Sequence, residues 1–196
     1  MKKPILAILL SVLILLGASF GLKGVGEKNA REAHLTLMKT LLPGAETFTA
    51  EPYSGEDANI VSVHKSDIGY VIETVTYGYA GEITMFVGVN NEGKVTGLVV
   101  HDAHETWGLG NQVLTDHVFL SQFLNSSGSF AVASHGEADA FSGATGEAAP
   151  AEGNSVEVDA ISGATVTSKA VVRCVNSAVA YVTGADASSG ATTWGG

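Results

Sequence analysis

Apolar and polar residues change their spacing several times along the chain, and each change marks a predicted element. Residues 4–22, PILAILLSVLILLGASFGL, carry no charged side chain, as is typical of a membrane-spanning helix. Residues 27–42 then place apolar side chains at helical spacing, and Pro43–Gly44 ends that helix. Its apolar stripe comprises Ala30, Ala33, Leu37, Met38 and Leu41. A membrane helix followed by an amphipathic helix is therefore predicted.

A cleaved signal peptide is the alternative for residues 4–22, because Lys2 and Lys3 precede them and Gly17 and Ser19 suit a cleavage site. The length of 19 residues favours an uncleaved anchor, since about 1.5 Å per residue nearly covers a hydrocarbon core of about 30 Å. On either interpretation we expect the following domain outside the cytoplasm. With the anchor, the protein is a single-pass protein of the cell (inner) membrane.

Alternating and β-branched residues dominate the next part of the chain and predict β-strands. The predicted strands are residues 59–65, 69–81, 82–89 and 94–102. Residues 90–93, Asn-Asn-Glu-Gly, have the composition of a hairpin turn between the last two. Strands joined by such short turns pair side by side, so an antiparallel sheet is expected.

A helical segment and a long polar segment follow the predicted sheet. Residues 115–124, TDHVFLSQFL, predict a helix with Thr115 or Asp116 as its N-cap. Residues 125–154 are rich in Ser, Gly, Ala and Glu, which predicts a long surface loop or a partly disordered insertion.

The next segment predicts a strand over residues 156–162 and then a helix that begins near Thr167 or Ser168. The apolar face of this helix comprises Val171, Val172, Val175, Ala178, Val179 and Val182. The predicted fold is α+β, an antiparallel sheet with packed helices, preceded by one N-terminal transmembrane helix. Its divisions are an anchor (1–24), one domain (25–184, with the insertion at about 125–154) and a flexible tail (185–196).

Composition narrows the classes of function. Charged residues make up 15% of the chain and its net charge is -10, which argues against nucleic acid as a partner. The single cysteine, Cys174, excludes a disulfide within the chain and a zinc or iron–sulfur site built from its cysteines alone. Redox chemistry would therefore need another cofactor.

The pattern Asp-x-x-Ser-Gly-Ala-Thr occurs three times, ending at Thr145, Thr165 and Thr192. Only the middle copy has a predicted strand before it and an amphipathic helix after it. Gly163 and Ala164 would let a ligand approach the backbone, and Thr165 would stand where free N–H groups and the helix dipole favour a phosphate. By spacing alone, an ordinary helix cap is the more frequent explanation of such a Ser/Thr cluster.

The second motif, HDAHETWGLG, covers residues 101–110 and directly follows a predicted strand. His101, His104 and Glu105 do not have the spacing of the zinc-protease motifs, so a metal site is not expected. The Gly-x-Gly at Gly108 and Gly110 lacks the βαβ context of a dinucleotide site. Without further information, this is a glycine-rich loop that caps the sheet.

Together these segments resemble the FMN-binding domain family, and within it most closely the G subunits of Rnf complexes. Those complexes are membrane-bound ferredoxin:NAD oxidoreductases that couple electron transfer to ion translocation. The chain is similar also to the C subunits of sodium-pumping NADH:quinone oxidoreductases. The resemblance covers nearly the whole chain: the apolar N-terminal helix, LLPGAE (41–46), GYAGEITMFVGVNNEGKVTGLVV (78–100), ETWGLG (105–110) and DAISGATVTSKAV (159–171).

In that family the heptad is a flavinylation motif, and its last threonine carries FMN through a phosphoester bond that a flavin transferase makes from FAD. The resemblance therefore implies covalent FMN on Thr165, with Thr145 and Thr192 as minor candidate acceptors. The other implied cofactor-binding residues are Asp159, Ser162, Gly163 and Ala164, and, in a loop packed against the flavin, Glu105, Thr106, Leu109 and Gly110. Trp107 occupies a position where the family usually has proline.

The resemblance implies an electron-carrier subunit within an ion-translocating oxidoreductase. Its expected partners are the other subunits of that complex, the membrane and a flavin transferase during maturation. No catalytic residue and no metal ligand of its own are expected, because the flavin would carry the redox chemistry. The alternatives are a membrane-anchored binding or adaptor domain without flavin and the equivalent subunit of a sodium-pumping NADH:quinone oxidoreductase.

Overall fold

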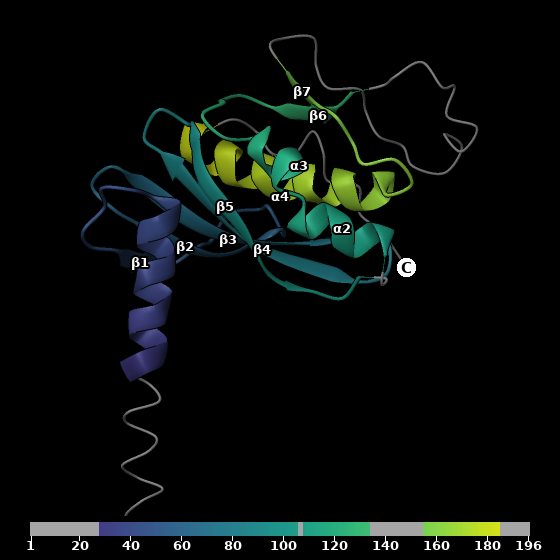
Figure 1. Cartoon of the computed structure of the whole chain (residues 1–196). Coiled ribbons are helices and arrows are strands. Elements are labelled where there is room, and N and C mark those ends of the chain that lie inside the picture. The colour runs from purple at the N-terminus through teal and green to yellow at the C-terminus, as the bar shows by residue number, and fades with distance from the viewer. Residues whose placement is uncertain (1–27, 106–107, 134–154, 185–196) are drawn as a thin grey trace, which may run out of the picture. The chain divides into compact units, whose positions relative to one another are not determined.

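The computed structural model of the chain describes residues 28–105, 108–133 and 155–184 (Figure 1). The predicted anchor, the predicted tail and most of the predicted insertion lie outside these ranges and stay predictions. Within the described ranges, no helix combines the length and the apolar character that crossing a bilayer requires. The chain divides into two units, one ending at Met38 and one beginning at Lys39, and the second contains the whole sheet.

The predicted helix is confirmed over residues 28–41, and of its predicted apolar stripe Met38 and Leu41 are buried and Leu37 is half-buried, whereas Ala30 and Ala33 are exposed. Pro43 follows its end, and Gly44 has a φ of +96°, a left-handed conformation that glycine adopts readily. Pro43–Gly44 therefore ends the helix as the sequence indicated.

A five-stranded antiparallel sheet forms the body of the second unit, with its strands in chain order. The strands are β1 (Thr49–Glu51), β2 (Ile60–Lys65), β3 (Gly69–Tyr77), β4 (Glu82–Asn90) and β5 (Val95–Ala103). The four predicted strands are confirmed, whereas the short edge strand β1 was not predicted. Residues 78–81, expected to continue a strand, instead form the β3–β4 turn, which the Gly78 N–H closes on the Gly81 carbonyl at 2.8 Å.

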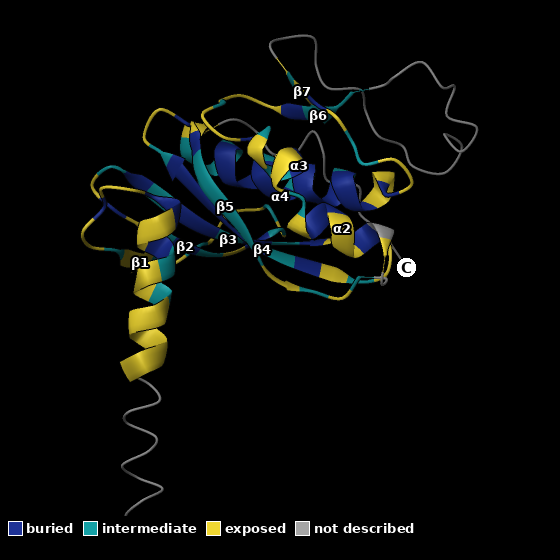
Figure 2. Cartoon of the chain, viewed as in Figure 1, coloured by how far each residue is buried: buried dark blue, intermediate teal, exposed yellow. Residues whose placement is uncertain are grey.

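Helix α4 (Thr165–Thr183) covers one face of this sheet and completes the main core. Val171, Val175 and Ala178 are fully buried against strand residues such as Ile72 and Val87. Figure 2 shows the buried side of α4 turned toward the equally buried central strands. The apolar face predicted for this helix is confirmed, with Val182 only partly buried.

Contacts between α4 and β3 fix the direction of the helix. The Thr76 hydroxyl donates to the Ala170 carbonyl at 3.1 Å, near the end of β3. At the start of β3, the ring of Tyr70 lies 5.7 Å from that of Tyr181. The helix therefore runs antiparallel to β3, and its amino terminus lies at the end of the sheet where β3 turns into β4.

Cys174 lies on the sheet side of α4 and is fully buried. Its sulfur is 3.3 Å from the Thr76 hydroxyl oxygen. Burial raises the pKa of the Cys174 thiol, so the side chain stays protonated at neutral pH and serves as part of the core.

Two short helices stand where the sequence predicted one. They are α2 (Leu109–Thr115) and α3 (His117–Ser121). Asp116 separates them and caps α3, because its carboxylate accepts from the Val118 and Phe119 N–H groups at 2.8 and 3.0 Å. Of the two predicted N-cap candidates, Thr115 and Asp116, the structure therefore has Asp116. Helix α2 was not predicted, because its sequence, LGNQVLT, contains glycine and little helical pattern.

The expectation of a surface loop from residue 125 is wrong for its first part. Strand β6 (Phe130–Val132) pairs in parallel with β7 (Val156–Val158), the short strand that replaces the predicted 156–162. Phe130 is 3% exposed and lies 5.2 Å from the Phe123 ring. This pairing joins segments far apart in the sequence, so no local pattern could indicate it.

Two facing glycines allow the chain to cross the sheet closely. Gly88 and Gly97 are partners in the β4–β5 pairing, and the backbone of Leu41 lies on both. A Cβ atom on Gly88 would collide with the Leu41 carbonyl oxygen. That oxygen accepts a 2.6 Å hydrogen bond from the Thr96 hydroxyl. The close approach therefore depends on the missing side chain.

We expect Gly88→Ala to lower the free energy of unfolding by about 1–3 kcal/mol, because the added methyl group displaces Leu41 from the sheet. Urea denaturation of the purified domain measures this loss. Val61→Ala is the control, since Val61 is 53% exposed on β2 and a surface substitution changes stability by about 0.5 kcal/mol or less. Equal midpoints for Gly88→Ala and the wild type would contradict the packing argument.

Candidate functional site

The amino terminus of α4 is an open helix end. Ala164 is the N-cap and offers no side-chain hydrogen bond, and the first turn contains no acidic residue. The first backbone bond of the helix runs from the Ser168 N–H to the Ala164 carbonyl at 2.9 Å. The N–H groups of residues 165–167 therefore precede the helical hydrogen-bond ladder and, with the helix dipole, favour an anion.

Thr165 is the first residue of this helix and is exposed. The helix start expected from the sequence, near Thr167 or Ser168, is two or three residues too late. Both of those residues are buried instead, within the first turns of α4. Because α4 starts at Thr165, this residue belongs to the first helical turn, together with the open N–H groups.

The loop before α4 has a fixed shape. Gly163 has a φ of +80°, a left-handed conformation suited to glycine. The buried Ser168 hydroxyl accepts from the Ile161 N–H at 3.3 Å and donates to the Ala164 carbonyl at 3.0 Å. Ala164 is 6% exposed, whereas Ser162 and Thr165 are exposed. The loop thus buries its alanine and presents its hydroxyl groups to solvent.

Gln122, at the end of α3, is a residue of this site that sequence reasoning missed. Its side-chain amide accepts from the Asp159 N–H at 2.8 Å and donates to the Asp159 carbonyl at 3.3 Å. Asp159 begins the heptad and is exposed. A lone glutamine after a short helix carries no sequence signal for this contact, which depends on how α3 and β7 pack.

Glu105, in the second motif, holds the β3–β4 turn. Its carboxylate accepts from the Tyr79 N–H at 2.7 Å. A Cβ atom on Gly78 would collide with that carboxylate, and one on Gly81 would lie 2.7 Å from the His104 carbonyl oxygen. Two glycines thus let the turn and residues 104–105 pack closely, and Glu105 has a structural contact in addition to its expected place near a cofactor.

The rest of the predicted loop is described only in part. Thr106 and Trp107 lie outside the described residues, so their expected roles remain predictions. Gly108 has φ +108° and ψ −117°, which glycine reaches and other residues rarely do. Leu109 begins α2, and Gly110 is buried within it. The backbone conformation that requires glycine is therefore at Gly108.

The structure brings both motifs to the same end of the sheet. The Arg173 guanidinium donates to the Tyr77 carbonyl at 3.0 Å, which joins α4 to the end of β3. The adjoining turn is held by Glu105, and α2, which follows the second motif, packs against α4. In Figure 1 the start of α2 and the green, amino-terminal end of α4 lie together at this end. The Tyr77 hydroxyl, also here, donates to Glu82 at 2.7 Å, which raises the pKa of Tyr77.

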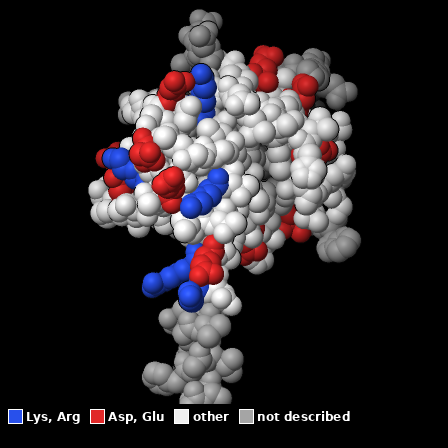
Figure 3. Space-filling model, turned by 60° about the vertical axis from the view of Figure 1, so that its left-hand side comes forward, with Lys and Arg blue, Asp and Glu red and all other residues white. Residues whose placement is uncertain are grey.

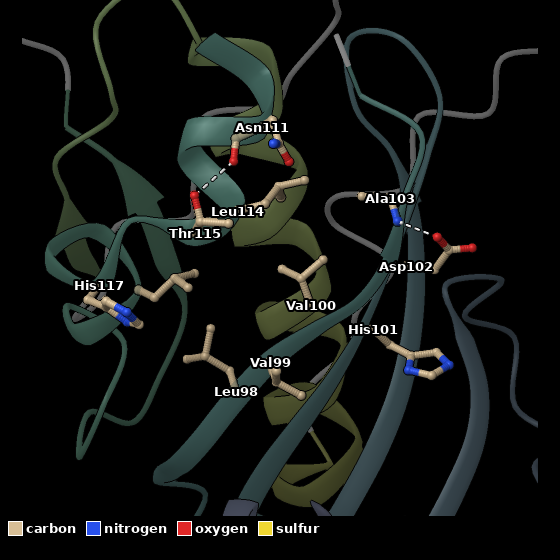
Figure 4. Close-up of a pocket in the computed structure, with 11 residues that line it drawn as sticks. Leu98, Val99, Val100, His101, Asp102, Ala103, Asn111, Leu114, Thr115 and His117 are labelled. Carbon is tan, nitrogen blue, oxygen red and sulfur yellow. Dashed lines mark hydrogen bonds between the residues drawn. The ribbon is translucent and has the colours of Figure 1, made fainter. Parts of the chain in front are cut away.

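A groove of about 550 Å³ lies between β5 and the helices α2 and α3. Leu98 and Val100 line its strand side, and Leu114 lines its helix side. Figure 4 shows these side chains turned into the groove, whereas His101 points away from it. Residues 101–103, which begin the second motif, also line the groove, so this motif borders a concavity with both apolar and polar walls.

The charged surface offers no separate basic region on the face shown in Figure 3, where Lys and Arg side chains lie beside Asp or Glu. Two of these lysines form ion pairs: the Lys65 Nζ lies 3.3 Å from the Glu51 Oε1, and the Lys94 Nζ lies 2.9 Å from the Glu92 Oε2. Within the part of the chain that is described, no group of three or more His, Cys, Asp and Glu side chains has the geometry of a metal site. His101 instead packs edge-on to the Phe86 ring at 5.1 Å.

A family model of the FMN-binding domain matches residues 78–180. The chain belongs to the FMN-binding domain family. The matched range includes the Glu105–Gly110 loop and the heptads ending at Thr145 and Thr165, whereas the heptad ending at Thr192 lies outside it.

Curated relatives agree with this assignment. The chain is 33% identical over 157 residues to the G subunit of the ion-translocating oxidoreductase complex of Methanosarcina acetivorans, covering 74% of this chain and 72% of that one. It is 34% identical over 113 residues to the G subunit of the Na(+)-translocating ferredoxin:NAD(+) oxidoreductase complex of Acetobacterium woodii, covering 57% of this chain and 48% of that one. The chain thus matches about half the length of the latter relative.

A solved structure is also similar. It is the crystal structure of NqrC from Shewanella oneidensis, with a TM-score of 0.44 and 21% sequence identity. The similarity covers 70% of this chain and 64% of that one.

The Glu105 contact makes a prediction about the β3–β4 turn. We expect Glu105→Ala to speed hydrogen exchange of the Tyr79 amide about fivefold, because a lost hydrogen bond of about 1 kcal/mol opens the turn. Glu105→Gln keeps an acceptor oxygen and should stay near the wild type. Exchange followed by NMR measures both variants.

Glu82→Ala is the matched control, because it removes the carboxylate that accepts from the Tyr77 hydroxyl in the same hairpin. Tyr79 exchange should not change in that variant. If Glu105→Ala also leaves the Tyr79 rate unchanged, the carboxylate does not hold the turn.

Proposed function

We propose that this chain is an electron-carrier subunit with one FMN bound covalently to Thr165, acting in a membrane-bound ion-translocating oxidoreductase complex of the Rnf type. One observation supports Thr165 as the attachment site. It is an exposed threonine at the uncapped amino terminus of a 19-residue helix, in a chain that belongs to the FMN-binding domain family. An uncapped helix end suits a phosphate group, and the Thr165 hydroxyl is the nucleophile beside it.

The residues around Thr165 fit a phosphoester group. Gly163 and the buried Ala164 leave the outer side of the loop without a bulky side chain. The N–H groups of residues 165–167 would donate to phosphate oxygens, and the dipole of α4 would stabilise their negative charge. No acidic residue in the first turn opposes that charge.

Attachment requires FAD as co-reactant and a flavin transferase. The Thr165 Oγ1 attacks the phosphorus on the FMN side of FAD and forms a new P–O bond. The bond from that phosphorus to the bridging oxygen breaks, AMP leaves with the oxygen, and the threonine proton passes to a base of the transferase. No electrons are exchanged, so the cofactor keeps its redox state.

When bound, FMN supplies one- and two-electron transfer chemistry. The chain's own residues hold and surround it. Glu105 fixes the turn next to the second motif, and Gly108 shapes the backbone before α2. The groove bordered by this motif includes apolar side chains such as Leu98, Val100 and Leu114, against which a flat ring system could pack.

Membership of a complex is supported by the relatives. Those in Acetobacterium woodii and Methanosarcina acetivorans are both named as G subunits of ion-translocating oxidoreductases. A relative in Clostridium ljungdahlii, 34% identical over 116 residues, is named as the G subunit of a proton-translocating ferredoxin:NAD(+) oxidoreductase complex. The corresponding role here is an electron relay that depends on neighbouring subunits.

The proposal includes a membrane anchor at residues 1–24, supported by the uncharged segment 4–22. We expect the full chain to sediment with membranes and to resist extraction by salt. Removal of residues 1–24 should yield a soluble domain that still accepts flavin, because both motifs lie beyond them. A mature amino terminus near Phe20 would instead show signal cleavage and contradict the anchor.

We expect Thr165→Ala to abolish covalent FMN, because alanine offers no hydroxyl nucleophile. Thr165→Ser keeps the hydroxyl and should be modified at least in part. Intact mass after expression with the flavin transferase measures the number of phosphoflavin groups on each chain. The fold should survive, since such a threonine contributes about 1 kcal/mol to a stability of about 5–15 kcal/mol.

The other two heptads provide matched controls for this test. Thr145→Ala and Thr192→Ala should each retain one flavin, because neither heptad is followed in the sequence by the apolar spacing of an amphipathic helix. If the Thr165→Ala chain carries flavin at full occupancy, a flanking heptad is the acceptor. An unmodified wild-type chain under the same conditions would contradict the proposed cofactor altogether.

A further inference from the structure

Gln122 makes a two-bond contact with the start of the heptad. One side-chain amide satisfies both backbone groups of Asp159, accepting from its N–H at 2.8 Å and donating to its carbonyl at 3.3 Å. Two hydrogen bonds to one residue fix the orientation of the backbone as well as its position. The contact joins residues 37 positions apart, so it is a feature of the tertiary fold.

The backbone of Gln122 is itself firmly held. Gln122 is the C-cap of α3, and its N–H donates to the Phe119 carbonyl at 3.2 Å. Phe119 and Phe123, on either side of it, are 2% and 0% exposed, and their rings pack edge to face at 5.5 Å. The half-buried Gln122 side chain therefore extends from a backbone that its buried neighbours Phe119 and Phe123 hold in place.

The far end of the same heptad is held by α4. Ser168 binds the Ile161 N–H and the Ala164 carbonyl, and the Ala164 N–H donates to the Ile161 carbonyl at 2.9 Å. The segment from Asp159 to Thr165 is thus fixed at its beginning by Gln122 and at its end by Ser168. Thr165 follows directly on the second fixed point.

We propose that Gln122 is a positioning residue for the attachment of FMN to Thr165. By holding Asp159, it keeps the exposed heptad in one conformation, so that the transferase meets an ordered hydroxyl and does not have to order the loop itself. Ordering a nucleophile in advance lowers the entropic part of the barrier for its attack. This inference rests on the proposed function, because it concerns the same modification.

The chain contains a matched contact outside the heptad, on strand β6, which pairs with β7 just before the heptad begins. The Asn176 amide accepts from the Phe130 N–H at 2.8 Å and donates to the Phe130 carbonyl at 2.9 Å. It therefore clamps strand β6 with the same two bonds that Gln122 makes to Asp159. Loss of either amide removes two hydrogen bonds from the fold, but the bonds of Asn176 are to Phe130, whereas those of Gln122 are to the heptad itself.

The experiment compares Gln122→Met with Asn176→Leu in the full chain, each substitution retaining approximate size and removing both bonds. Initial rates of modification are measured with flavin transferase and FAD, below the unfolding temperature of each variant. We expect Gln122→Met to be modified about tenfold more slowly than the wild type, which is the effect of about 1.4 kcal/mol from two weak surface hydrogen bonds. Asn176→Leu should be modified at the wild-type rate, although its melting temperature falls.

Gln122→Glu gives a further readout, because its carboxylate still accepts from the Asp159 N–H but cannot donate to the carbonyl. Its rate should lie between those of the wild type and Gln122→Met. Equal rates for wild type and Gln122→Met would overturn the inference while leaving the flavin proposal intact. Equal slowing by Gln122→Met and Asn176→Leu would also overturn it, because the effect would then follow stability. A wild-type chain that accepts no flavin would refute the proposed function itself.

Discussion

Helix α4 packs across the sheet, and most of the other contacts in this domain follow from that packing. Val171, Val175 and Ala178 lose all contact with solvent against β3 and β4, and each buried valine contributes about 1.5–3 kcal/mol. Because the helix runs antiparallel to β3, this packing also sets where its amino terminus lies. Thr165 is carried to the β3–β4 end of the sheet by apolar contacts made elsewhere along the helix.

Small residues then allow the connecting segments to approach one another at that end. Because Gly78 and Gly81 have no side chains, Glu105 and His104 can pack closely against the β3–β4 turn. Gly163 allows the turn that buries Ala164 and exposes Thr165. Polar side chains complete the arrangement, since Glu105, Gln122 and Ser168 each satisfy backbone groups of neighbouring segments. The loops near the site therefore take their shape from specific hydrogen bonds rather than from extensive apolar packing.

This arrangement suits the proposed electron-carrier role. A covalently attached flavin would need a rigid point of attachment, which the long helix α4 would provide. The parts expected to face the flavin and neighbouring subunits are loops, whose sequence can vary without loss of the core. The buried Cys174, with its raised thiol pKa, belongs to the core.

Local signals in the amino-acid sequence were enough to identify several elements. Alternating β-branched residues identified β2 to β5, and the apolar spacing of Val171, Val175 and Ala178 identified α4, because these periods follow from the geometry of a strand and a helix. The flanking elements favoured Thr165 over Thr145 and Thr192 as the proposed attachment site, and that choice stays a prediction. Contacts between distant partners emerged only in the folded chain: the parallel pairing of β6 with β7, the burial of Phe130, the contact of Glu105 with Tyr79 and the clamp of Gln122 on Asp159. Such contacts leave no periodic pattern, since each is made by a single side chain or a short segment whose partner is fixed only once α4 has packed on the sheet.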